Sequence, residues 1–290
     1  MNDLAMLFND LESATKDPCD IICEACDEYE GTALQHARAL MNAQLLSNQL
    51  MRGYQLNCKK AELHCAQNDG TTGDYMLYEE AAENGVIGKL RVIINRIIQF
   101  WVDLCHRAVT TIKTKICTAQ AKAAVRKMKN TVRMDATLAN KKIQAPDISS
   151  ALSVITKYRR ICDKRDAQFV RGIFTVSEAK GIAATVSDFE RAFSNATVGA
   201  AALCVVTVSG LIIAIEQEMD QLPTYVTNLE QTQSHILDRM AQTVSDEASA
   251  SAMEAMQAAA NFRVQLGKQE LDTHMKYLSD LIKLAKDMIQ

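Results

Sequence analysis

The sequence predicts an all-α protein, built as a bundle of long helices with coiled-coil-like segments. Only 11 glycines and 3 prolines occur in 290 residues, so turns are few and the elements between them are long. The 48% hydrophobic content can form a substantial core. We place the main boundary at residues 144–150, between an N-terminal helical region, 1–143, and a C-terminal one, 150–290, because Pro146 cannot continue a helix.

The first region is expected to begin with two or three helices. Asp17 has the side chain of an N-cap and Pro18 suits the first helical position. Gly31 and Thr32 predict that a second helix begins there and continues to about residue 67. Residues 68–73 are rich in Asn, Gly and Thr and predict a loop. A further helix is expected from about residue 74, interrupted or kinked near Gly85.

Residues 86–116 have the clearest helical pattern in the chain. At 100° per residue, their apolar side chains occupy about half of the helix circumference. Such a wide face suits contact with two or more neighbouring helices, or a membrane interface. We favour packing in the bundle and expect this face to be buried against the N-terminal helices. The candidate interaction residues at its centre are Ile94, Ile97, Trp101 and Leu104.

A basic segment follows, and no glycine or proline separates it from residues 86–116, so we predict one basic amphipathic helix over 86–142. Residues 1–88 carry 15 acidic and 5 basic side chains, net −10, whereas residues 89–142 carry 13 basic and 2 acidic, net +11. The basic residues can pair with the acidic region or attract the phosphates of a nucleic acid without reading its sequence. The candidate residues are Lys122, Arg126, Lys127, Lys129 and Arg133.

The second region is also expected to be helical throughout, with helices over 150–168 and 177–194. The β-branched stretch FVRGIFTVS between them could be extended. Residues 196–215 contain no charged side chain, and about 20 apolar residues are enough to cross a bilayer. Since half of them are Ala, Gly, Ser or Thr, we favour a buried helix and keep membrane insertion as the alternative.

Pro223 is expected to separate an apolar run from a long segment rich in Ala and Gln, which is also predicted to be helical. Apolar residues recur there at alternating steps of four and three, which is typical of a coiled-coil seam. The residues of this seam are Leu271, Met275, Leu278, Ile282, Ala285 and Ile289.

No catalytic or cofactor-binding motif is recognisable. Cys19, Cys23 and Cys26 match the spacing of iron–sulfur ligands, but they lie on an acidic predicted helix that would repel an anionic cluster. The nine cysteines follow no export signal, so we interpret them as reduced thiols. The five histidines lie on separate segments. We therefore predict no enzymatic activity, cofactor, metal or small-molecule substrate, and a location in the cytoplasm or a virion.

One segment resembles helical structural proteins of tailed-bacteriophage virions. Residues 78–89, YEEAAENGVIGK, are followed by repeated Ile-Ile steps and the aromatic pair Phe100-Trp101. The resemblance covers about 40 residues of the chain. It implies a virion component of the head or the tail-associated machinery, which meets packaged DNA or the host membrane during ejection.

Three functions follow from these observations. The first is a non-enzymatic structural or interaction protein, a virion component that assembles with copies of itself or with other structural proteins. The second is a membrane-active helical protein that inserts residues 196–215. The third is a non-specific nucleic-acid-binding protein that uses residues 113–142.

Overall fold

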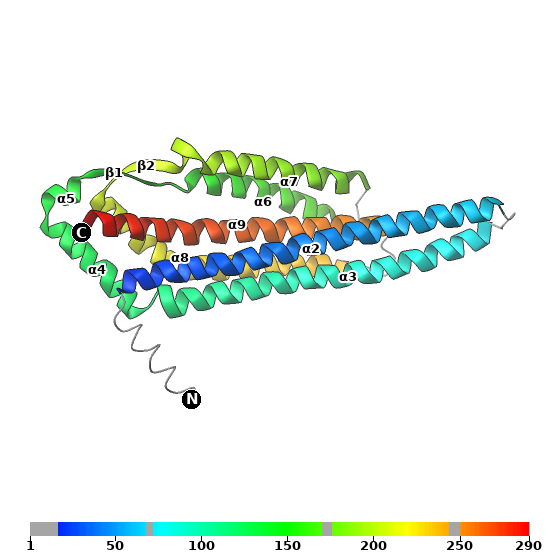
Figure 1. Cartoon of the computed structure of the whole chain (residues 1–290), viewed down its shortest axis with the longest axis horizontal. Coiled ribbons are helices and arrows are strands. Elements are labelled where there is room, and N and C mark those ends of the chain that lie inside the picture. The colour runs from blue at the N-terminus through cyan, green and yellow to red at the C-terminus, as the bar shows by residue number, and fades with distance from the viewer. Residues whose placement is uncertain (1–16, 68–71, 170–175, 244–249, 290) are drawn as a thin grey trace, which may run out of the picture.

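The computed structural model describes residues 17–67, 72–169, 176–243 and 250–289 (Figure 1). Nearly all of them are helical, and one small antiparallel sheet joins two short strands. The predicted all-α class is therefore confirmed. Two predictions lie largely outside the described residues: the loop over 68–73, of which 68–71 are not described, and the extended stretch FVRGIFTVS, of which 170–175 are not described.

Four long helices form the body of the molecule. Helix α2 (Pro18–Gln67) and helix α3 (Thr72–Thr111) lie side by side and extend beyond the other helices at one end (Figure 1). Helix α8 (Val208–Thr243) and helix α9 (Ala250–Ile289) pack against this pair. Helix α9 is central, because it contacts α2, α3 and α8 as well as the two helices described next.

Helix α6 (Ser149–Phe169) and helix α7 (Val176–Thr197) form a further layer over α9 (Figure 1). They agree with the helices predicted over 150–168 and 177–194. Aromatic side chains join this layer to α9: the Phe189 ring lies 5.4 Å from that of Tyr158 and 5.8 Å from that of Phe262, measured between centroids. The layer therefore has a small apolar cluster of its own.

The main hydrophobic core is continuous across α2, α3, α8 and α9. Burying this amount of apolar surface is the main favourable contribution to folding. The core includes residues from both sides of the predicted boundary at 144–150. On α9 it contains five of the six residues of the predicted seam, and Ile289 packs against it while partly buried.

An ionic cluster lies inside the bundle between α6, α8 and α9. The fully buried Arg263 of α9 donates to Asp166 Oδ2 at 2.7 Å and to Asp163 Oδ1 at 2.6 Å, both on α6. It also donates to Gln233 Oε1 of α8 at 3.1 Å. A buried cation is tolerated only when its donors are paired in this way. The cluster therefore fixes how α6 and α8 sit against α9.

The start of α2 is as predicted, but its interior is not. The Cys19 N–H donates to the Asp17 side chain at 2.9 Å, so Asp17 caps the helix. Gly31, expected to begin a second helix, lies inside α2, which continues to Gln67. The reason is that a glycine costs a helix only about 1 kcal/mol, less than the burial of apolar residues such as Tyr29 and Leu40 on either side provides. Gly85 is likewise inside α3.

The single helix predicted over 86–142 is wrong. After α3 the chain forms one π-helical turn, η1 (Ile112–Ile116), then helix α4 (Ala119–Met134) and the short helix α5 (Ala136–Asn140). A side chain caps the start of each new helix: Thr118 accepts from the Ala121 N–H, and Asp135 accepts from the N–H groups of Thr137 and Leu138. N-caps of this kind redirect a chain without glycine or proline.

The apolar helix predicted over 196–215 is also wrong. Helix α7 ends at Thr197, Gly199 has a φ of +71°, and a 3₁₀ turn η2 (Gly199–Ala202) leads into strand β2 (Leu203–Thr207). A positive φ is easy only for glycine and ends the helix. Strand β2 pairs antiparallel with β1 (Lys142–Pro146), with Lys142 opposite Thr207 and Pro146 opposite Leu203.

Pro223, expected to separate two segments of the chain, lies inside α8. Proline has no N–H, so the carbonyl of Met219, four residues earlier, cannot receive the usual helical hydrogen bond. The Cys117 thiol donates to this carbonyl at 3.1 Å instead. Burial of Leu222 and Val226 beside the proline further holds the helix in place.

Candidate functional site

The four predicted apolar interaction residues lie in the core rather than on the surface. Ile94, Ile97, Trp101 and Leu104 are all buried. The face of 86–116 is covered by α2, as expected, and also by α8 and α9. The Trp101 ring lies against the backbone of Gly267 on α9, where an added Cβ would come within 2.5 Å of the ring. Within the described chain these residues bind the protein's own helices.

The five predicted basic residues all lie on α4, where two are paired with α8. Lys122 Nζ lies 2.8 Å from Asp220 Oδ1, and Lys129 Nζ lies 2.5 Å from Glu216 Oε2. The acidic N-terminal region does take part elsewhere, because Lys115 pairs with Glu28. Part of the basic segment is therefore neutralised, by α8 at Lys122 and Lys129 and by the acidic N-terminal region, as expected, at Lys115.

The remaining three basic residues, Arg126, Lys127 and Arg133, are exposed. None of them makes an ion pair with any residue that the structure describes. Two further exposed cations follow along the chain: Lys141, just before β1, and Lys142, its first residue. Residues 126–147 thus carry six basic and two acidic side chains, net +4.

Exposed apolar side chains lie at the same end of the molecule. Met134, at the last position of α4, is 89% exposed, and Val205 of β2 is 68% exposed. Leu203 is half-exposed, and the strand register puts Leu203 and Val205 on one face of the sheet with Lys142 and Gln144. Val198 and Ile213, on either side of this segment, are also exposed.

We call this region the sheet end: residues 126–147 together with residues 198–213. It comprises the end of α4, α5, both strands and the start of α8, which lie together at one end of the bundle (Figure 1). Large exposed apolar side chains grouped with unpaired cations are typical of interaction surfaces. The sheet end is therefore the candidate functional site.

The sequence identified the basic half of this site but missed its apolar half. The candidates Arg126, Lys127 and Arg133 belong to it. Leu203 and Val205 were assigned to a buried helix, although Leu-Cys-Val-Val-Thr is rich in the β-branched residues favoured in strands. Met134 was missed because the helix predicted over 86–142 runs past it, whereas in the structure α4 ends at this residue and leaves it exposed.

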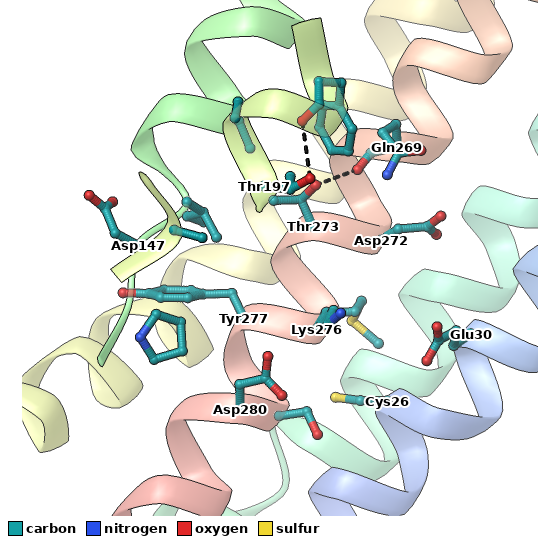
Figure 2. Close-up of a pocket in the computed structure, with 18 of the residues that line it drawn as sticks. Cys26, Glu30, Asp147, Thr197, Gln269, Asp272, Thr273, Lys276, Tyr277 and Asp280 are labelled. Carbon is teal, nitrogen blue, oxygen red and sulfur yellow. Dashed lines mark hydrogen bonds between the residues drawn. The ribbon is translucent and has the colours of Figure 1, made fainter. Parts of the chain in front are cut away.

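A groove of about 560 Å³ adjoins the sheet end, with which it shares Pro146, Asp147, Ala202 and Leu203. It lies between α2, α9 and the β1–α6 and α7–β2 junctions. Figure 2 shows Glu30 of α2 on one side, Asp147 on the other, and Asp272, Lys276 and Asp280 of α9 along the floor. Five carboxylates and two lysines are among the residues that line it. Burial raises the pKa of Asp280, and Asp27 and Glu30 raise it further against the opposing effect of Lys276 and Lys283.

Among the lining residues that the structure describes, Cys26, Thr273 and Thr197 are not activated as nucleophiles. Burial raises the pKa of Cys26 to about 12, so its thiol is protonated at neutral pH. The Thr273 hydroxyl is used within α9, where it donates to the Gln269 carbonyl at 2.7 Å, and the Thr197 hydroxyl similarly donates to Phe193 (Figure 2). Among the residues described as lining the groove there is no histidine that could act as a base.

The three cysteines with iron–sulfur spacing are buried in α2. Cys19 Sγ lies 3.7 Å from the Met128 sulfur, and the Cys23 thiol donates to the Ser279 carbonyl at 3.9 Å. Burial raises the pKa of Cys19 to about 12, which disfavours the thiolate that a metal requires. No group of three or more His, Cys, Asp or Glu side chains within the described part of the chain could hold a metal ion.

No protein-family model, curated protein or solved structure matches this chain. Its candidate functional site therefore rests on geometry alone. Among the helices described here, none combines the length and apolarity needed to cross a membrane.

Proposed function

We propose that this protein is a non-enzymatic helical interaction protein that binds anionic membrane surfaces through its sheet end. The observation that carries the proposal is the grouping of Leu203, Val205 and Met134 with exposed cations that make no ion pair with the described residues, at one end of the bundle. An interfacial site needs apolar side chains that enter the boundary between headgroups and acyl chains, and basic side chains that remain among the headgroups. Both are present here.

The proposal replaces insertion of a helix over 196–215 with contact at the membrane surface. Strand β2 and turn η2 present their side chains at an end of the molecule, and the sheet keeps the strands' backbone groups paired with one another. Such an element can place Val198 and Val205 in the headgroup region without crossing the bilayer. The basic residues add about 1 kcal/mol each near an anionic surface.

The exposed apolar residues favour a membrane over a nucleic acid. Phosphate contacts require cations alone, and no stacking aromatic residue lies among residues 113–142. Leu203, Val205 and Met134 would gain nothing from a polyanion, whereas burial of their exposed surface in lipid is favourable. The nucleic-acid function stays an alternative prediction, as does the role of a virion component.

Flotation with vesicles tests the proposal. Purified protein should float with phosphatidylcholine vesicles that contain phosphatidylglycerol, float poorly with phosphatidylcholine alone, and dissociate as salt is added. Val205→Asp should weaken flotation about tenfold or more, because it removes an apolar side chain and adds a repelled charge. Leu56→Asp is the matched control, since Leu56 is 59% exposed on α2, outside the sheet end.

Equal loss of flotation in both variants, or no flotation of the wild-type protein, would contradict the proposal. Binding of duplex DNA separates the alternative, because Val205→Asp leaves the basic residues of α4 unchanged. If DNA binds the wild-type protein and this variant equally and the vesicles bind neither, the nucleic-acid function is the one supported. Circular dichroism of each variant confirms that the helices are retained.

A further inference from the structure

A second cavity, of about 350 Å³, lies within the sheet end between α4 and α8. Helix α4 contributes Lys129, Val132 and Arg133, and α8 contributes Ser209, Ile212 and Ile213. Two cations, a hydroxyl and three apolar side chains thus line the cavity. Its volume is in the range of small-ligand sites.

The charge of this cavity is positive. Lys129 forms an ion pair with Glu216, which lies one turn beyond Ile212 on α8 and neutralises part of its charge. Arg133 makes no ion pair with the residues that the structure describes. A guanidinium offers parallel N–H donors that match two oxygens of a phosphate, and a serine hydroxyl can donate to a third.

Exposed apolar side chains also occur at the cavity and next to it in the sequence. Ile213 lines it and is exposed, and Met134, which follows Arg133, is almost fully exposed. A free phosphate ion would use only the cations, whereas a phospholipid has both a phosphate and an adjoining acyl region. The combination of cations and exposed apolar residues therefore favours the lipid.

We propose that this cavity binds the phosphate of an anionic phospholipid headgroup, with Arg133 as its main ligand and Lys129 and Ser209 as further donors. The inference rests on the proposed membrane binding and makes one part of it specific. Met134 and Ile213 then contact the acyl region beside the bound headgroup.

Three substitutions on α4 test the proposal in the full chain. Arg133→Gln should weaken binding to phosphatidylglycerol-containing vesicles at least tenfold. Arg133→Lys keeps the charge but loses the paired donors, and it should also bind clearly more weakly than the wild-type protein. The matched control is Arg126→Gln, exposed on the same helix but outside the cavity. It should weaken binding by less than about fivefold, which is the contribution of one cation near an anionic surface.

The outcomes separate the cavity from the membrane surface as a whole. If Arg133→Gln and Arg126→Gln weaken binding equally, or Arg133→Lys binds like the wild-type protein, the cavity is not a phosphate site, although the proposed function survives if Val205→Asp still fails to float. If the wild-type protein does not float, the proposed function and this lipid site both fail. Calorimetry with glycerol 3-phosphate and with inorganic phosphate then shows whether the cavity takes a soluble phosphate instead; the lipid proposal is overturned in that case as well.

Discussion

Gly267 determines how closely α9 approaches α3. A Cβ at this position would lie 2.5 Å from the Cη2 atom of the buried Trp101 ring, which is shorter than carbon atoms tolerate. We predict that Gly267→Ala destabilises the protein by about 1–3 kcal/mol, because a rigid ring in a packed core cannot move aside. Urea unfolding, followed by the fluorescence of Trp101, measures the change.

The control is Gly53→Ala in α2, where no described atom beyond the chain neighbours and the nearby helix backbone lies within 4 Å of the added Cβ. Alanine favours a helix interior over glycine by about 0.5–1 kcal/mol, so this variant should be more stable than the wild-type protein. If Gly267→Ala is stabilising to the same degree as Gly53→Ala, the close contact between α3 and α9 is wrong.

Asp280 in the groove predicts a pH dependence. Its pKa is raised above the ordinary value of 3.8, so between that value and the folded pKa the native protein binds a proton that the unfolded chain does not. Its contribution to stability therefore falls as pH rises through this window. Asp280→Asn should be more stable than the wild-type protein at pH 7, by less than about 1 kcal/mol after solvent screening.

This gain should shrink as the pH is lowered through the same window, because Asp280 then becomes neutral in the wild-type protein too. Thermal unfolding of both proteins from pH 7 downward measures it. Asp287→Asn, at an exposed position further along α9, is the matched substitution. A gain that is independent of pH would rule out protonation of Asp280 as its cause.

At the level of whole elements, α8 depends on a contact from Cys117, the residue that follows η1. The Met219 carbonyl, left without a helical partner by Pro223, accepts from the Cys117 thiol. We predict that Cys117→Ala destabilises the wild-type protein by about 0.5–1.5 kcal/mol. In a Pro223→Ala background the residue at 223 can donate to Met219, so the cost of Cys117→Ala should be smaller. Urea unfolding of the four proteins measures this coupling.

Identical costs of Cys117→Ala in the two backgrounds would mean that the thiol does not replace the missing backbone donor. Cys105→Ala is a useful comparison, because Cys105 is buried on α3 and packs in the same core. Its cost should be the same with and without Pro223, since it makes no contact that depends on the proline.

Helical periodicity predicted the elements whose buried face repeats regularly. The face of 86–116 and the seam from Leu271 to Ala285 are buried, and α6 and α7 occur where they were expected. Helix breaks were predicted poorly, because the chain tolerates Gly31 and Pro223 inside helices and breaks at Thr118 and Asp135. Capping hydrogen bonds depend on the local backbone as well as on residue type.

Strand β2 was missed because its partner is remote in sequence. Residues 203–207 pair with residues 142–146, and helices α6 and α7 lie between them. Local pattern does not reveal such a pairing, and an uncharged run around a strand resembles a buried helix. This is also why only the cations of the sheet end were predicted, since its exposed apolar residues depend on the strand register.

Across the whole molecule, the two ends of the bundle differ in construction. One end is the paired helices α2 and α3 alone, and the other carries the sheet and the candidate site (Figure 1). Between them, α9 contacts every long helix of the described chain and the α6–α7 layer. A membrane bound at the sheet end would thus be connected to a long helical body, whose long helices all contact the central helix α9.

Because that body has a continuous core, we predict that it unfolds in one cooperative transition. Ile282 of α9 and Trp101 of α3 belong to the same core. Ile282→Ala should therefore lower stability by about 2–5 kcal/mol and shift the unfolding transitions seen by Trp101 fluorescence and by circular dichroism equally. Ile213→Ala, at an exposed position of α8, should change the free energy of unfolding by less than about 0.5 kcal/mol as measured by either signal. If residues 1–143 and 150–290 folded independently, Ile282→Ala would shift the circular dichroism and leave the fluorescence of Trp101 unchanged.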